Sequence, residues 1–270
     1  MLFALCVSGP TLCAVVVQTG TSQQVQELRA LHVHALPPRL LPLQDFFLLN
    51  ACRAAADMLV TSGSNVRLEN NLETRVQGAF RSGLLAWRST LPDCSQQEPR
   101  PVIVTQSVLP DGYPILEQTP PPVLLTPCAA EQVRALGHAS SVDVCDVAEY
   151  LRPPGTAMEA CQAALAMGRR HGLHNVLLEV GPAFRPVHIA QQLVFSVMPW
   201  DALLALWEAV GCEERVEGVV GECVATVPEL ELDFELLVDH DVSGRESLWG
   251  TSRPLADITW STRVFRRKGS

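Results

Sequence analysis

The residues best suited to chemistry form a short acidic, glycine-containing motif, Glu179-Val180-Gly181-Pro182, which ends an apolar run at residues 176–178. Such a run is typical of a buried strand, and open α/β sheets bind their ligands at the carboxyl ends of strands. A glycine at that point lets backbone N–H groups come close to a phosphate or a flat ring. The motif therefore predicts a ligand-contacting turn. Short glycine motifs are weakly specific, so a buried strand followed by an ordinary turn stays open as the alternative.

A helix over residues 156–171 is expected to position this motif, because its apolar residues recur on one face. Its last turn holds Arg169, Arg170 and His171, which suit the negative end of a helix, and Gly172 is a natural residue to end it. Helix, glycine, strand and acidic turn thus form one unit.

The remaining pattern alternates between strands and helices, which predicts an α/β fold with a largely parallel sheet. Further strands are expected at residues 12–18, 57–60, 101–105, 123–126, 142–145 and 193–197, and helices at 46–56 and 129–136. Residues 23–34 are ambiguous and could be a short helix. Residues 61–65 are expected to form a polar turn before a short helix at 66–69, whose free N–H groups would suit a phosphate. Beyond Pro199 the pattern weakens, with a helix at 202–210 and extended segments at 232–238 and 258–266.

The composition excludes several classes of protein. The chain has 270 residues and a net charge of −9, which argues against nucleic acid as a partner, because no basic stripe is available. Nine cysteines occur singly without a C-x-x-C pair, which indicates a reducing compartment, and we expect the protein to be cytoplasmic. Residues 1–17 are apolar but lack a basic start, so a first strand is favoured over a signal peptide. No apolar run reaches about twenty residues, so no membrane span is expected.

Metal and hydrolase chemistry find little support. His171 and His174 form H-x-x-H and Asp239-His240-Asp241 is an acid–histidine cluster, but neither has a third ligand at metal spacing, so no metal site is predicted. The sequence contains no G-x-S-x-G elbow, no phosphate-binding G-x-x-x-x-G-K-[ST] loop and no G-x-G-x-x-G motif. A serine hydrolase of the α/β type, a nucleoside triphosphatase and a standard Rossmann dehydrogenase are therefore disfavoured.

The most informative stretch runs from Arg53 to Arg75, in the order Arg-Ala-Ala-Ala-Asp-Met-Leu-Val-Thr-Ser-Gly-Ser-Asn-Val-Arg-Leu-Glu-Asn-Asn-Leu-Glu-Thr-Arg. Together with the motif at Glu179, the strand at residues 100–104 and the Leu-Leu-Thr strand at 124–126, it resembles the C-terminal reductase domain of the riboflavin-biosynthesis protein RibD and its relatives. The order and spacing agree over residues 45–197. The first 40 residues and residues 200–270 diverge from that pattern.

The resemblance implies a dihydrofolate-reductase-like fold with three layers, in which helices flank a mostly parallel mixed sheet. It implies one domain over residues 1–270, a homodimer, and NADPH-dependent reduction of a ribosylaminopyrimidine phosphate. Two alternatives stay open: a relative that has lost catalysis and acts as a binding or interaction module, and a reductase of another heterocycle such as a pterin. The zinc-dependent deaminase half of bifunctional relatives is absent, since Pro127-Cys128 lacks the second cysteine of its signature.

The resemblance also implies roles for individual residues. By position, Arg53, Arg75 and Glu179 are similar to substrate-binding residues. Arginine suits bidentate contact with phosphate and a carboxylate suits sugar hydroxyls. The residues similar in position to cofactor-binding ones are Ser64, Asn65, Glu69, Gly181, Pro182, Ala183 and Phe184. No catalytic group is assigned, because hydride transfer depends mainly on orientation. Purely structural roles remain the alternative: Arg53 could cap its helix, and Arg75 could pair with a neighbouring glutamate.

The sequence departs from the family pattern at four points. Asn65 replaces a threonine of the family pattern, and Val180 replaces the first glycine of a pair. Asn71 stands near the position at which the family has a proline, and the segment before Arg75 is one residue shorter than in the family. The first-strand signature, A-x-S-x-D-G, is replaced by residues 17–22, Val-Gln-Thr-Gly-Thr-Ser. These departures bear on the substrate pocket and on cofactor approach.

Overall fold

The computed structural model describes residues 9–18, 43–69, 71–91, 98–137, 141–151, 156–181, 184–199, 233–244 and 258–269. The strands are β1 (Gly9–Gln18), β2 (Met58–Ser62), β3 (Arg100–Val104), β4 (Val123–Thr126), β5 (Asp143–Asp146), β6 (Asn175–Glu179), β7 (Gln192–Pro199), β8 (Phe234–Gly244) and β9 (Ile258–Arg267). The α-helices are α2 (Leu43–Ala55), α3 (Gly63–Leu68), α4 (Arg81–Arg88), α5 (Ala129–Leu136), α6 (Ala157–Arg170) and α7 (Pro186–Ile189). The described residues also form the 3₁₀ helices η3 (Pro114–Glu117) and η4 (Val147–Glu149).

The described strands form one mixed sheet in the order β5-β4-β3-β2-β6-β1-β7-β9-β8. The first seven strands of that order run parallel, and β9 and β8 continue the sheet as an antiparallel pair. The chain leaves β2 toward β3 on one side and leaves β6 toward β7 on the other. Because β2 and β6 are neighbours, the connections diverge at their carboxyl ends, which is where open α/β sheets place their ligands.

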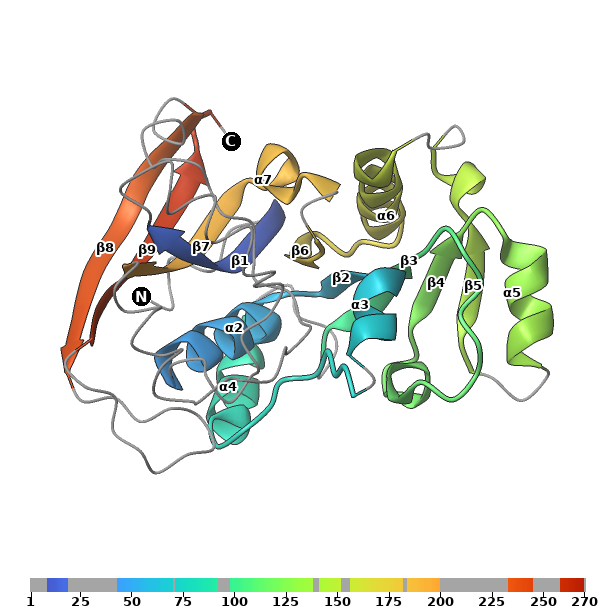
Figure 1. Ribbon diagram of the computed structural model, residues 1–270, viewed down its shortest axis with the longest axis horizontal. Coiled ribbons are helices and arrows are strands. Elements are labelled where there is room, and N and C mark those ends of the chain that lie inside the picture. The colour runs from blue at the N-terminus through green and yellow to red at the C-terminus, as the bar shows by residue number, and fades with distance from the viewer. Residues whose placement is uncertain are drawn as a thin grey trace, which may run out of the picture.

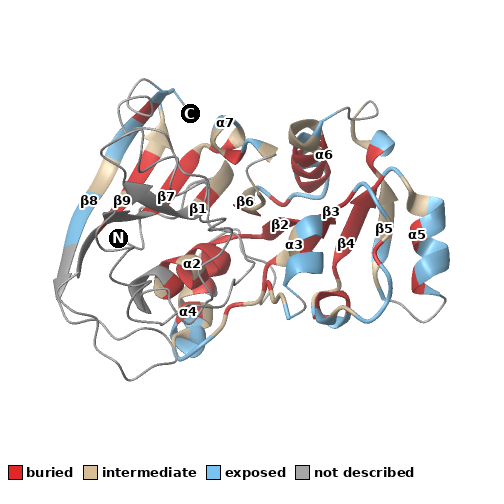
Figure 2. Cartoon of the chain, in the orientation of Figure 1, coloured by how far each residue is buried: buried red, intermediate tan, exposed pale blue. Residues whose placement is uncertain are grey.

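Helices cover both faces of the sheet, which gives the three layers visible in Figure 1. On one face, α6 packs on alternate residues of the parallel strands, among them Val60 and Leu178. On the other face, α2 and α4 pack on the intervening residues, such as Leu59 and Leu177. Farther along that second face, α3, α5 and η3 pack on Ile103 and its neighbours. The central strands are therefore buried on both sides, as Figure 2 shows, and this explains their nearly continuous apolar sequence.

Two buried charged residues fix how the elements meet. Asp57 lies just before β2, and its carboxylate accepts hydrogen bonds from the backbone N–H groups of His174 (3.3 Å) and Asn175 (3.1 Å). This contact sets β2 against β6 at their amino ends. Arg88 in α4 is 2% exposed and donates to the carbonyls of Ala54 and Ala56 at the end of α2. The guanidinium stabilises the negative end of α2 and joins the two helices.

Most predicted elements are confirmed, and several boundaries move. The predicted helix at 156–171 is α6, with Thr156 and Glu159 forming a capping box and Gly172 in the left-handed region at φ 72°. The predicted polar turn at residues 61–65 is wrong, because β2 continues to Ser62 and α3 starts at Gly63. The Ser62 hydroxyl accepts the Asn65 N–H and caps that helix.

The two extended segments predicted near the C-terminus form strands that pair with one another, and two other predicted segments lie outside the described residues. The extended segments predicted at 232–238 and 258–266 are β8 and β9. Helix α4 was not predicted, and its first residue, Arg81, pairs at 2.6 Å with the buried Glu98. The ambiguous segment at 23–34 and the predicted helix at 202–210 lie outside the described residues.

Candidate functional site

The candidate site lies where the chain leaves β2 and β6, at their neighbouring carboxyl ends. Thr61 and Glu179 are register partners on the two strands. The Asn65 side chain in the first turns of α3 donates from Nδ2 to the Glu179 carbonyl at 3.0 Å and to Thr61 Oγ1 at 3.4 Å. The two sequence segments identified separately, after β2 and at Glu179, therefore meet at one point of the sheet edge.

Arg53 and Glu179 form a bidentate ion pair at this edge. Arg53 Nε lies 2.7 Å from Glu179 Oε1, and Nη2 lies 2.8 Å from Oε2. The third guanidinium nitrogen, Nη1, donates to the carbonyl of Arg75 at 3.2 Å. The structure thus brings together all three residues predicted to bind substrate. Their side chains differ in access, at 6% exposed for Arg53, 14% for Glu179 and 43% for Arg75.

Arg75 presents its charged group to solvent. Its guanidinium makes one loose ion pair, at 3.5 Å, with Glu73, whose side chain is 40% exposed. An exposed pair of this kind adds little to stability and is readily exchanged for another anion. The alternative predicted for Arg75, pairing with a neighbouring glutamate, is therefore present, and it leaves the guanidinium accessible.

The charges at the site interact. Burial alone would lower the pKa of Arg53, but the Glu179 carboxylate beside it raises the pKa, and the net shift is upward. Glu69 follows α3 directly, and its pKa is raised by partial burial first and by the Glu179 carboxylate second, with Arg53 opposing both. Glu69 nevertheless keeps an exposed surface. The site therefore carries one carboxylate, Glu179, paired with the buried guanidinium, and a second carboxylate, Glu69, whose pKa is influenced by both charges.

The residues predicted to bind a cofactor lie around this cluster where the structure describes them. Ser64 is exposed in the first turn of α3. Among the described residues, a Cβ added to Gly181 would meet no atom within 4 Å, and the φ of Gly181 lies outside the left-handed region, as expected for a residue before proline. Phe184 and Val180 are partly buried and pack against the core. Val180, which replaces a glycine of the family pattern, thus packs its side chain against the core. Pro182 and Ala183 lie outside the described residues.

Sequence reasoning missed Gly63 and Arg67 at the neighbouring strand end. An added Cβ at Gly63 would lie 2.5 Å from Thr105 Oγ1 and 3.1 Å from Arg67 Nη1. Arg67 is exposed, and its Nη2 donates to Ser107 Oγ at 2.7 Å and to the Ser107 carbonyl at 3.2 Å. The glycine leaves room for a guanidinium that ties α3 to the segment after β3. Their four-residue spacing on a helix was the signal that could have revealed this contact.

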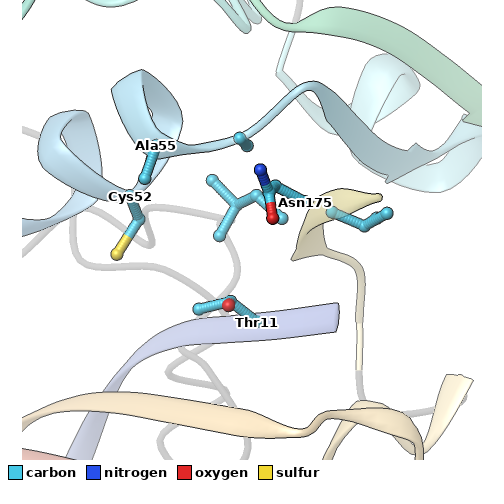
Figure 3. Close-up of a pocket in the computed structure, with 7 residues that line it drawn as sticks. Thr11, Cys52, Ala55 and Asn175 are labelled. Carbon is cyan, nitrogen blue, oxygen red and sulfur yellow. The ribbon is translucent and has the colours of Figure 1, made fainter. Parts of the chain in front are cut away.

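A small pocket lies toward the amino ends of β1 and β6. Thr11, Cys52, Ala55 and Asn175 line it, as Figure 3 shows. Val176 and Leu177 also line it, so the pocket lies along the first half of β6, whereas Glu179 of the candidate site ends that strand. Within the described residues, no group of three or more His, Cys, Asp or Glu side chains could hold a metal ion. No described helix is long and apolar enough to cross a membrane.

Comparison with solved structures identifies the fold. The chain superimposes on a pyrimidine reductase-like protein from Corynebacterium diphtheriae with a TM-score of 0.54 and 14% identity, covering 100% of this chain and 96% of that one. This match confirms the expected dihydrofolate-reductase-like fold, with its mixed, mostly parallel sheet and flanking helices. At this identity the likeness concerns the fold alone.

Two further structures resemble the chain more weakly. RibD from Acinetobacter baumannii gives a TM-score of 0.48 at 12% identity over 97% of this chain, and the chain spans 58% of the length of that protein. The riboflavin biosynthesis reductase Rib7 of Saccharomyces cerevisiae gives 0.48 at 13% identity, covering 97% of this chain and 90% of that one. No model of a protein family matches the sequence, and no curated protein matches it.

Proposed function

We propose that this protein is an NADPH-dependent reductase of a ribosylaminopyrimidine phosphate, acting at the carboxyl ends of β2 and β6. The observation that carries the proposal is the convergence of the two predicted motifs, joined by the Asn65 bond to the Glu179 carbonyl. Residues far apart in sequence thereby supply a clamped carboxylate, an exposed guanidinium and an open glycine turn at one sheet edge. That edge is the switch point at which α/β sheets bind ligands.

The substrate is assigned to the charged residues of the site. Arg75, with its accessible guanidinium, would contact the phosphate, since arginine can bind phosphate oxygens bidentately. Glu179 would accept hydrogen bonds from ribose hydroxyls, because each carboxylate oxygen keeps accepting capacity beyond its bond to Arg53. A fixed acceptor and a fixed cation orient the sugar, and orientation is the main contribution a protein makes to hydride transfer.

The cofactor is assigned to the open turn beside these residues. NADPH supplies the hydride when bound. No atom of the described residues lies within 4 Å of a Cβ placed at Gly181, and this space fits the close approach of a flat ring or a phosphate. The Ser64 hydroxyl is exposed and available for hydrogen bonding, and Glu69 suits a ribose hydroxyl better than a phosphate because of its charge. Asn65 holds the Glu179 carbonyl with its Nδ2, which leaves its amide oxygen as an acceptor.

The test combines turnover with binding. Purified protein should consume NADPH only when 5-amino-6-(5-phosphoribosylamino)uracil is present. NADPH at a hundred times its dissociation constant should add about 2.7 kcal/mol to the free energy of unfolding. Gly181→Asp is the matched control: its side chain enters open space, so the variant should fold, while its volume and charge should abolish NADPH binding. If millimolar NADPH and NADH both fail to stabilise the wild type, the binding-module alternative replaces this proposal.

A further inference from the structure

The buried guanidinium of Arg53 is already committed to the protein. Its Nε and Nη2 bind the two oxygens of Glu179 at 2.7 and 2.8 Å, and its Nη1 donates to the Arg75 carbonyl at 3.2 Å. Nε and Nη2 form the edge with which arginine engages carboxylates and phosphates in two parallel bonds. In this protein a carboxylate occupies that edge.

A phosphate could occupy the Nε/Nη2 edge of Arg53 only by displacing Glu179. The Arg53 side chain is 6% exposed, and the carboxylate beside it is 14% exposed. A phosphate entering this position would lie against the negative charge of Glu179, and the nearby Glu69 adds a second carboxylate. Like charges at short range in a poorly solvated place repel strongly. The arrangement opposes direct phosphate binding by Arg53, which is the role implied by the sequence resemblance.

The three contacts of Arg53 instead connect the other two substrate-binding residues. The bonds from Nε and Nη2 fix the side chain of Glu179 at the end of β6, and the bond from Nη1 fixes the backbone of Arg75. Arg53 itself sits in the last turn of α2, a helix packed against the sheet. A rigid helix thus sets the distance between a carboxylate and the residue that carries an accessible guanidinium.

We infer that Arg53 is a positioning residue, which holds Glu179 and Arg75 at the spacing of a ribose hydroxyl and its 5′-phosphate. The inference rests on the proposed function, which assigns those two residues to the substrate. The inference gives the residues separate roles. Arg75 binds the phosphate and Glu179 binds the sugar, whereas Arg53 orients these two residues and does not itself touch the substrate.

The experiment compares the substrate with its dephosphorylated ribosyl analogue. Arg53→Lys keeps the positive charge but cannot form the bidentate pair. It should lower kcat about ten- to a hundredfold with either compound, because misorientation acts on the chemical step. The ratio of kcat/KM between the two compounds should fall by much less than tenfold, because Arg53 is bonded to the backbone carbonyl of Arg75 and not to its guanidinium. Arg75→Ala should reduce that ratio at least tenfold, mainly through KM. If Arg53→Lys erodes phosphate preference as Arg75→Ala does, Arg53 binds phosphate and the inference fails.

Two additional measurements keep the inference testable. If Arg53→Lys does not fold, Glu179→Asp, which shortens the carboxylate and breaks the pair from the other side, should give the same pattern. If the wild type turns over neither compound, the proposed function fails, and crystal structures grown with inorganic phosphate decide the role of Arg53. A phosphate bound to Arg53 overturns the inference, as does a Glu179 carboxylate that keeps its position in the Arg53→Lys structure.

Discussion

Adding one methyl group at Gly63 should destabilise this protein, whereas the same change at Gly181 should not. The Cβ of Gly63→Ala would lie 2.5 Å from Thr105 Oγ1 and 2.7 Å from Thr105 Cβ, closer than non-bonded atoms tolerate. Thr105 is buried and β-branched, so it cannot turn away easily. Overpacking of this kind costs about 1–3 kcal/mol. Gly181→Ala places its methyl in open space, and the loss of freedom in its unfolded chain should stabilise it by about 0.4–1 kcal/mol.

A second glycine gives the helical control for this comparison. Gly83 lies in α4, and a Cβ added there would again meet no atom of the described part of the chain within 4 Å. Gly83→Ala should stabilise by up to about 1 kcal/mol through helix propensity. All three glycines have φ outside the left-handed region, so the backbone penalises alanine at none of them. The difference between Gly63→Ala and Gly83→Ala therefore isolates the contact with Thr105.

Urea unfolding followed by circular dichroism measures all three variants. With a slope of about 1–3 kcal/mol per molar urea, the midpoint of Gly63→Ala should fall by about 1 M relative to Gly83→Ala. Equal midpoints for these two variants would refute the close packing between the start of α3 and the end of β3. A lowered midpoint for Gly181→Ala would refute the open turn on which the cofactor assignment depends.

Three other perturbations give distinct expectations. Removing either partner of the Arg53–Glu179 pair should lower the free energy of unfolding, measured by urea titration, by about 3–5 kcal/mol, because the other charge stays buried. Replacing Arg53 by Met and Glu179 by Leu in one variant should lower it by much less than the sum of the two single losses. A loss equal to that sum would contradict an interaction between the two residues. The raised pKa of Glu69 means that ionisation of this carboxyl disfavours the fold. The free energy of unfolding of Glu69→Gln should therefore match that of the wild type below the ordinary pKa of 4.5 and exceed it as pH rises from there through the raised pKa. A difference that does not depend on pH would refute the raised pKa. Burial raises the pKa of Cys161 to about 12, so a thiol reagent should label the half-buried Cys128 and leave Cys161 unmodified until the protein unfolds, as peptide mapping can establish.

The sequence by itself determined the succession of elements in the central part of the chain. The strand Val123–Thr126 and the helix Ala129–Leu136 match their predicted limits, because short apolar runs bounded by turn residues and a clear helical period are local signals. The cap at Thr156 and the glycine after α6 are equally local. Helix α4 escaped prediction because its buried residues, Leu84 and Arg88, include a charged one whose burial depends on the carbonyls of another helix.

The sequence also pointed to the candidate site residues, but only the tertiary structure decided how they relate. Arg53 and Glu179 lie 126 positions apart, and nothing local indicates that they pair. They meet because β6 inserts between β1 and β2, which puts the end of the late strand beside the end of the early one. The burial that results makes a free guanidinium unfavourable at position 53 and ties it to the nearest carboxylate. The sequence therefore indicates which residues belong to the site. The order of strands in the sheet decides that Arg53 and Glu179 form a buried ion pair while the Arg75 guanidinium stays exposed.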